Sequence, residues 1–198
     1  MSGSFRHVLF LVRHGQTAAN AAGLLLGRAD PPLTDLGRRQ AQALATALPE
    51  PDRLLSSPLR RARDTAAAFG VDVEIDDRWI ELDYGELDGV APASVPADVW
   101  RRWRADCGFV PMGGESLREL GARVREACGE LESDARDHNV VVITHVSPIK
   151  AAVAWALDVS DAVAWRMFVE DAAVARIAVG PNGPALRSFN ERYARPAP

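Results

Sequence analysis

The 198-residue chain has few cysteines and no long apolar run, and each shortage excludes a class of protein. Two cysteines, Cys107 and Cys128, are too few for a disulfide framework, so we expect a reducing compartment. No stretch approaches the roughly 18 apolar residues that a membrane-spanning helix needs, and residues 1–6 lack the apolar segment of a signal peptide. We therefore expect a cytoplasmic protein with no membrane partner.

Charge and histidine content argue against two further classes. The formal net charge is -4, which disfavours a general nucleic-acid surface, although almost all the positive charge is arginine and Lys150 is the only lysine. None of the four histidines lies in a metal-binding motif such as His-Glu-x-x-His. The expectation is thus no nucleic-acid partner, no metal and no other cofactor.

The composition that remains is typical of a globular domain. Apolar residues make up 47% of the chain and charged residues 25%. There is no internal repeat or compositional break, so residues 1–198 are predicted to form a single domain. The irregular stretch over residues 79–114 is predicted to be a cap that recognises the substrate.

Strand and helix patterns alternate along the chain. The expected strands, the last two forming a terminal hairpin, cover residues 8–12, 53–56, 71–75, 139–144, 174–179 and 185–189. The expected helices cover residues 35–48, 58–69, 99–104, 115–136 and 148–157. This order predicts a three-layer α/β fold, with a mostly parallel central sheet, helices on both faces and a C-terminal hairpin.

The first strand ends abruptly at Arg13-His14-Gly15, which places a guanidinium and an imidazole beside a glycine. That combination suits holding an anion against a nucleophile, and phosphate is the first candidate. The second strand runs into Arg60, and the last buried strand ends at His145. Because parallel strands end at one edge of the sheet, we expect these side chains to surround a single tetrahedral anion.

Several segments resemble, in the same order, those of the histidine phosphatase superfamily, which includes phosphoglycerate mutases and many small phosphatases. They are Leu11-Val12-Arg13-His14-Gly15-Gln16-Thr17 with Asn20, Ser56 to Thr65, Glu81 to Gly89, Gly113 to Ser116, and Thr144-His145. The resemblance implies that His14 is a nucleophile that forms a phosphohistidine. It also implies that Arg13, Arg60 and His145 complete the phosphate pocket.

The leaving alkoxide needs a proton, which points to a carboxylic acid near the pocket. The resemblance assigns this role to Glu81, and Asp83, Glu86 and Asp88 in the same segment remain open as alternatives. Further substrate contacts are expected from Gln16, Asn20, Gly27, Tyr84 and Val146.

The resemblance implies a metal-independent phosphomonoesterase that acts on a small phosphorylated metabolite as a monomer or homodimer. Mutases of the family usually carry a paired arginine followed by a proline-rich run, whereas here Trp103 follows Arg101-Arg102, which favours hydrolysis. Mutase-type phosphoryl transfer and a catalytically silent phosphate-binding or signalling module remain alternatives. The segment His145-Val146-Ser147-Pro148 is similar to phosphatase domains related to α-ribazole phosphatase.

Residues 100–104, Trp-Arg-Arg-Trp-Arg, allow two interpretations. They form either a substrate-recognition patch or an amphipathic helix with a solvated basic face. The sequence pattern leaves both open.

Overall fold

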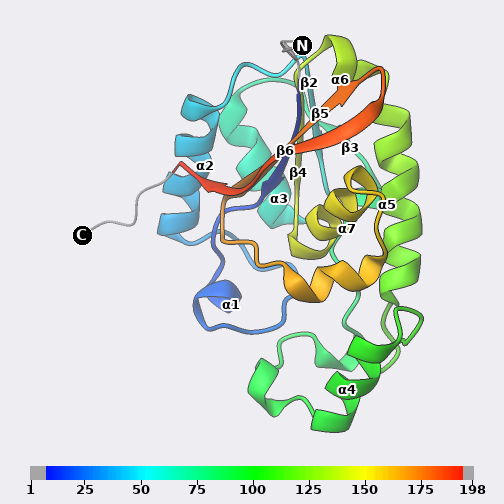
Figure 1. Cartoon of the computed structure of the whole chain (residues 1–198). Coiled ribbons are helices and arrows are strands. Elements are labelled where there is room, and N and C mark those ends of the chain that lie inside the picture. The colour runs from blue at the N-terminus through cyan, green and yellow to red at the C-terminus, as the bar shows by residue number, and fades with distance from the viewer. Residues whose placement is uncertain (1–7, 194–198) are drawn as a thin grey trace.

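The computed structural model describes residues 8–193 and contains a six-stranded sheet in the order β3-β2-β4-β1-β5-β6 (Figure 1). The strands are β1 (Leu9–Arg13), β2 (Arg53–Ser56), β3 (Glu74–Ile75), β4 (Val140–Thr144), β5 (Ala173–Gly180) and β6 (Gly183–Arg192). β1, β2, β3 and β4 run parallel, and β5 pairs antiparallel with both β1 and β6. The predicted parallel sheet with a terminal hairpin is confirmed.

Helices cover both faces of the sheet, as predicted. On one face, α2 (Asp35–Ala47) and α3 (Arg60–Ala66) pack against Phe10 and Val12 of β1. On the other face, α5 (Leu117–Leu131) and α7 (Val146–Ala156) pack against Leu9 and Leu11. The uninterrupted apolar run of β1 follows from this arrangement, because successive side chains point to opposite faces and both faces are buried.

The remaining elements are short. The α-helices are α1 (Ala18–Ala21), α4 (Ala97–Ala105) and α6 (Asp134–Asp137). The 3-10 helices are η1 (Ala67–Phe69), η2 (Asp77–Trp79), η3 (Gly85–Leu87), η4 (Pro92–Ser94) and η5 (Asp161–Arg166). None of the helices over residues 8–193 is long and apolar enough to cross a membrane.

Several predicted boundaries were wrong. The helix expected over residues 115–136 is in fact α5, which spans Leu117–Leu131, and a separate short helix, α6, follows at Asp134–Asp137. The strand expected over 71–75 is reduced to Glu74–Ile75, an exposed pair at the sheet edge. The helix expected from Pro148 begins at Val146, with His145 as its N-cap.

The carboxyl ends of β1, β2 and β4 lie together at one edge of the sheet. Arg13 at the end of β1 pairs with Thr144 at the end of β4, and Ser56 at the end of β2 pairs with Ile143. Figure 1 shows α1 and α4 at this end of the molecule. The loop after β1 is packed tightly against α2, because a Cβ on Gly15 would lie 2.3 Å from the carbonyl oxygen of Gly37.

Candidate active site

His14 follows β1 directly and is 2% exposed. Its Nδ1 lies 2.7 Å from the carbonyl oxygen of Gly15, so this nitrogen carries the proton and donates it. Its Nε2 lies 3.2 Å from Nε of Arg61, which donates to it. Burial, and then the positive charges of Arg61 and Arg13, lower the pKa of His14 well below its ordinary value. The imidazole is therefore neutral and has a defined lone pair on Nε2.

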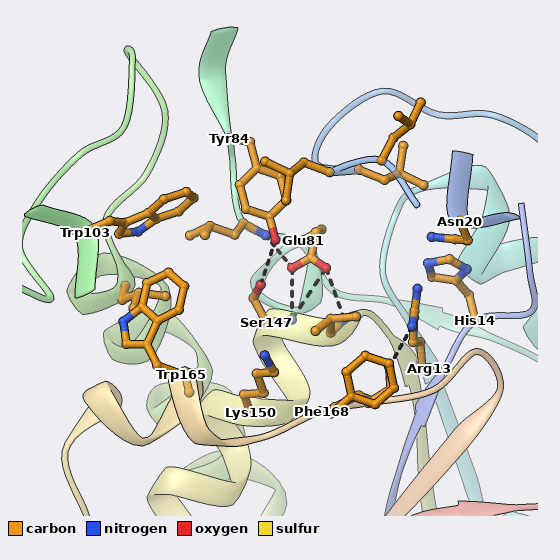
Figure 2. Close-up of a pocket in the computed structure, with 18 of the residues that line it drawn as sticks. Arg13, His14, Asn20, Glu81, Tyr84, Trp103, Ser147, Lys150, Trp165 and Phe168 are labelled. Atoms are coloured by element: carbon orange, nitrogen blue, oxygen red, sulfur yellow. Dashed lines mark hydrogen bonds between the residues drawn. The ribbon is translucent and has the colours of Figure 1, made fainter. Parts of the chain in front are cut away.

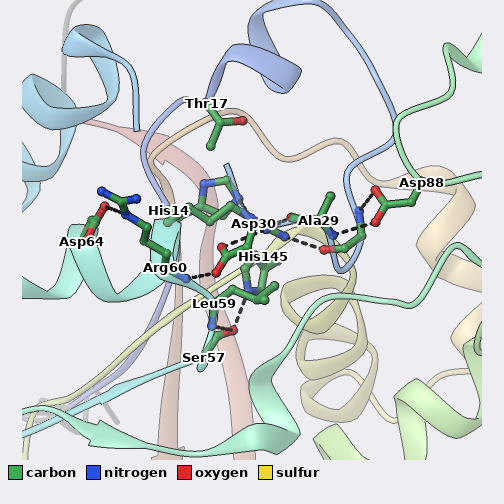
Figure 3. Close-up of polar contacts among 12 residues, drawn as sticks. His14, Thr17, Ala29, Asp30, Ser57, Leu59, Arg60, Asp64, Asp88 and His145 are labelled. Carbon is green, nitrogen blue, oxygen red and sulfur yellow. Dashed lines mark hydrogen bonds and ion pairs between the residues drawn. The ribbon is translucent and has the colours of Figure 1, made fainter. Parts of the chain in front are cut away.

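The prediction that Arg60 belongs to the phosphate pocket was wrong by one position. The Arg60 side chain is 57% exposed, and its Nε lies 3.3 Å from Asp64 on the same helix, away from His14 (Figure 3). Arg61 is instead fully buried against His14. Neighbouring residues of a helix point about 100° apart, so only one of two adjacent arginines can face the sheet edge.

The helical period contained the information that separates the two arginines. Thr65, one turn after Arg61, is also buried, and its hydroxyl accepts the backbone N–H of Gly15 at 3.0 Å. Arg61 and Thr65 thus form one face of α3 that holds the backbone around His14.

A loop and a carboxylate hold the Arg61 guanidinium in place. Nη1 donates to the carbonyl oxygen of Ala29 and Nη2 to that of Gly27, both at 2.7 Å. Asp88 in turn accepts the backbone N–H groups of Gly27 at 2.8 Å and Ala29 at 2.7 Å (Figure 3). Asp88 therefore fixes the loop that orients Arg61.

His145 follows β4 and is fully buried. Its Nε2 lies 2.7 Å from Oγ of Ser57, its Nδ1 is buried without a partner, and its ring centre is 5.0 Å from that of His14. Burial, followed by the charges of Arg61 and His14, lowers the pKa of His145 well below its ordinary value.

Arg13 is the last residue of β1, directly before His14, and lines the same cavity. It donates to the carbonyl oxygen of Val169 at 2.7 Å and pairs with Asp171 at 2.8 Å. Its Nε is buried without a hydrogen-bond partner. The structure thus gathers two imidazoles and two guanidiniums, from Arg13, His14, Arg61 and His145.

Glu81 is held at the N-terminus of α7. Its two carboxylate oxygens accept the backbone N–H groups of Val146 at 3.0 Å and Ser147 at 3.1 Å, and the N–H of Leu82 donates to it at 2.8 Å (Figure 2). The backbone N–H groups in the first turn of a helix lack partners within the helix, so they are available to a side-chain acceptor such as Glu81. Glu81 also lines the same cavity as His14.

The three alternative acids lie elsewhere. Asp83 accepts the N–H of Gly85, Glu86 is exposed, and Asp88 is engaged by the loop described above. Among these four acids, only Glu81 lines the cavity.

The predicted substrate-binding residues divide into two groups. Asn20, Tyr84 and Val146 line the cavity beside His14. Gln16 and Gly27 do not line the cavity. The side-chain oxygen of Gln16 accepts a hydrogen bond from the Thr34 hydroxyl, and the backbone of Gly27 accepts from Arg61 and donates to Asp88. A side chain at position 27 would place its Cβ 2.9 Å from the carbonyl oxygen of Leu82.

The cavity has a volume of about 280 Å³ and includes residues that sequence reasoning did not assign. These are Ser147, Lys150, Trp165 and Phe168, together with leucines and other apolar residues. Trp100 and Trp103 also line it, and the amphipathic-helix interpretation of residues 100–104 is confirmed, whereas substrate recognition by these residues stays a prediction. α4 is amphipathic, with exposed arginines, and its apolar side forms a wall of the cavity.

These side chains, at the carboxyl ends of parallel strands, place fixed positive charge around a neutral imidazole and a carboxyl group on the cavity wall, an arrangement suited to a phosphate ester. The chain belongs to the histidine phosphatase superfamily (branch 1), whose family model matches residues 9–192. The predicted family is thereby confirmed.

The chain is similar to two named mycobacterial proteins. A bifunctional protein of Mycobacterium tuberculosis is 36% identical over 160 residues, which are 76% of this chain but 44% of that protein. The chain therefore spans less than half of that relative's length. The glucosyl-3-phosphoglycerate phosphatase of the same organism is 36% identical over 163 residues, covering 74% of this chain and 73% of the relative.

Solved structures show the same fold. The native structure of mycobacterial glucosyl-3-phosphoglycerate phosphatase superposes with a TM-score of 0.82 at 30% identity, covering 93% of this chain and 98% of the other. A putative α-ribazole-5'-P phosphatase from Escherichia coli superposes with a TM-score of 0.81 at 27% identity, covering 96% and 99%. The predicted similarity to that phosphatase type thus has a structural counterpart.

Proposed function

We propose that this protein is a phosphomonoesterase that hydrolyses a small phosphorylated metabolite through a phosphohistidine on His14. The observation that carries the proposal is the neutral His14 Nε2, which is held by the Gly15 carbonyl and placed beside the Arg61 guanidinium. A phosphate bound here would meet positive charge already in position. Fixed positive charge of this kind stabilises the equatorial oxygens during phosphoryl transfer.

In the first step, His14 Nε2 attacks phosphorus and the bond to the leaving oxygen breaks. Glu81 enters this step in its protonated form and gives that proton to the departing alkoxide, so the alcohol leaves neutral. Arg61 transfers its Nε hydrogen bond from His14 to a phosphate oxygen as the new N–P bond forms. In the second step, Glu81 takes a proton from water, the water oxygen attacks phosphorus, and phosphate departs from His14.

His145 completes the anion site in this proposal. Without an anion, burial and then neighbouring positive charge disfavour its protonated form. A phosphate dianion between the two rings reverses this balance, because an opposite charge within a few ångströms favours the charged form. The partnerless Nδ1 of His145 is then available to donate to a phosphate oxygen.

The wider proposal is a metal-independent cytoplasmic enzyme of one domain, monomeric or homodimeric, that acts without nucleic acid or membrane. Arg13 and Arg61 supply the positive charge in this mechanism. Within residues 8–193, no three His, Cys, Asp or Glu side chains gather as a metal site.

The test is hydrolysis of p-nitrophenyl phosphate by the purified protein in excess chelator. We expect turnover by the wild type and by His138→Ala, which changes an exposed histidine. His14→Ala should abolish it. Full activity of His14→Ala would remove this residue from the mechanism.

The physiological substrate requires a panel. We would assay phosphate release from phosphorylated metabolites, including glucosyl-3-phosphoglycerate and α-ribazole 5'-phosphate. Isomerisation of phosphoglycerate in the presence of a bisphosphorylated primer would instead support the mutase alternative.

A further inference from the structure

The cavity beside His14 has an aromatic wall on the side opposite the catalytic histidine, formed by Trp100, Trp103, Trp165 and Tyr84. Figure 2 shows Trp103 and Trp165 facing Arg13 and His14 across the cavity. Trp100 and Trp103 stack with their ring centres 5.4 Å apart, and Trp165 meets Trp103 edge-on, also at 5.4 Å. Tyr84 meets Trp103 edge-on at 5.8 Å. These contacts make the wall a rigid, flat-sided surface.

The aromatic wall is not covered completely by the rest of the protein. Trp103 is 1% exposed, but Trp100 and Trp165 are only half-buried, and Phe168 at the same cavity is 68% exposed. A large apolar side chain left in solvent beside an apolar cavity marks a surface that a ligand can cover.

Hydrogen-bond acceptors are scarce on the side of the aromatic wall. The Tyr84 and Ser147 hydroxyls lie 3.5 Å from each other, and the indole N–H groups of Trp103 and Trp165 are buried donors without a partner. Most other lining residues beyond the catalytic groups are leucine, valine, alanine or aromatic. A sugar would lose water from several hydroxyls here with few acceptors to replace it, which is costly. An aromatic ring has no hydroxyl groups whose hydrogen bonds to water must be replaced.

One cation interrupts the apolar lining. Lys150 is the only lysine of the chain, lies one turn after Val146 on α7 and lines the cavity. Figure 2 shows its amine directed towards the cavity below Ser147. No hydrogen bond or ion pair joins it to any of residues 8–193. Burial lowers the pKa of this amine, and the charge of Glu81 acts in the opposite direction.

We infer that the substrate is the phosphate monoester of an aromatic alcohol that also carries an anionic substituent, with the ring on the aromatic wall and the anion at Lys150. This inference rests on the proposed phosphatase function. The reaction is unchanged: the P–O bond to the alcohol breaks, Glu81 protonates the alcohol oxygen, and water later releases phosphate from His14.

The test compares four phosphate esters of primary alcohols, so that the leaving oxygens are chemically similar. They are ethyl, glycerol, benzyl and 4-carboxybenzyl phosphate. We expect kcat/KM for benzyl phosphate to exceed that for ethyl or glycerol phosphate by about 10-fold or more. The carboxylate should add roughly another 10-fold, as expected for a hydrogen bond to a charged group.

Two variants locate the effect. Lys150→Met should remove the advantage of 4-carboxybenzyl over benzyl phosphate, whereas Arg39→Met, which removes a charge from the exposed surface of α2, should keep it. Trp165→Leu should reduce the advantage of benzyl over ethyl phosphate. Because Trp165 is only half-buried, this variant is expected to fold even where a change at the buried Trp103 does not.

A second readout does not depend on catalysis. The product alcohol, 4-(hydroxymethyl)benzoate, should change the tryptophan fluorescence of the wild type on binding, and Lys150→Met should weaken that binding. If no ester is hydrolysed but the alcohol binds in this way, the proposed function fails and the aromatic subsite stands. If glycerol phosphate is hydrolysed as well as the benzyl esters, or if Lys150→Met leaves the carboxylate preference intact, the inference is overturned.

Discussion

Replacing Arg60 and Arg61 of α3 by methionine, one at a time, tests which arginine binds phosphate. The structure places Arg61 beside His14, whereas the motif resemblance assigned Arg60. Methionine keeps an unbranched apolar side chain and removes the guanidinium. At position 61 the change deletes a buried donor to His14 Nε2 and two donors to backbone carbonyl oxygens. At position 60 it deletes an exposed ion pair with Asp64.

The expected magnitudes differ widely. Losing one preorganised donor to a transition-state charge costs about 10²–10³ in kcat, or roughly 3–4 kcal/mol, so Arg61→Met should lose at least that much. Arg60→Met should stay within about 2-fold of the wild type, since exposed ion pairs contribute about 0–1 kcal/mol. Arg61→Lys should not restore the rate, because an ammonium cannot reproduce the guanidinium contacts.

The assay is steady-state hydrolysis of p-nitrophenyl phosphate, together with urea unfolding of both variants. Unfolding matters because Arg61→Met also leaves two carbonyl groups without donors, which should cost about 1–3 kcal/mol of stability. Activity is therefore compared under conditions where both variants are folded. A larger catalytic loss in Arg60→Met than in Arg61→Met would refute the site described here.

Three further predictions follow from the same contacts. First, the folded-state pKa values of His14 and His145 lie below the unfolded value of 6.5. As the pH falls, the unfolded chain therefore binds protons first, and the free energy of unfolding should decrease below about pH 6.5. Urea unfolding at about pH 7.5 and 5.5 measures this free energy, and an unchanged value would contradict the prediction. Second, Glu81→Gln should lower kcat/KM for benzyl phosphate, which covers only the steps up to the phosphohistidine, by about 10²–10⁴-fold. It should spare kcat/KM for p-nitrophenyl phosphate, whose leaving group needs no proton, and equal losses in kcat/KM would exclude the donor role. Third, Asp88→Asn should loosen the loop that orients Arg61 and reduce kcat by about 10-fold. The exposed control Glu86→Gln should have no effect. Equal kcat values for Asp88→Asn and the wild type would show that the loop is held without Asp88.

The sequence was sufficient for the sheet and for the histidines because their signals are local and strong. β1 and β4 are uninterrupted apolar runs, and each ends at the histidine that the site uses. Parallel pairing then brings residues 14 and 145 together without any information from the loops. The hairpin at the C-terminus was equally clear from its turn residues.

The order of residues in the motif points to Arg60, whereas the helical phase of α3 points to Arg61. Arg60 and Arg61 have the same chemistry, and only the direction in which α3 presents them distinguishes the two. The burial of Ala62, Thr65 and Ala66 identifies the inward face, to which Arg61 belongs. A stricter use of the period would have favoured Arg61.

The cavity wall could not be predicted from local patterns. Trp103 and Trp165 belong to elements far apart in the chain, and no strand pairing fixes their relative positions. Lys150 was recognised only as the single lysine, since its approach to the cavity depends on where α7 begins. Substrate selectivity therefore requires the tertiary structure, whereas phosphate binding was visible in the strand ends.

The most direct measurement is a rapid-quench experiment with a ³²P-labelled phosphate ester, followed by neutral or alkaline work-up and mass spectrometry of the labelled peptide. The account predicts a transient phosphohistidine at position 14 that forms and decays at rates compatible with turnover, and no such species in His14→Ala. Steady turnover with no labelled enzyme, or with the label on another residue, would contradict it.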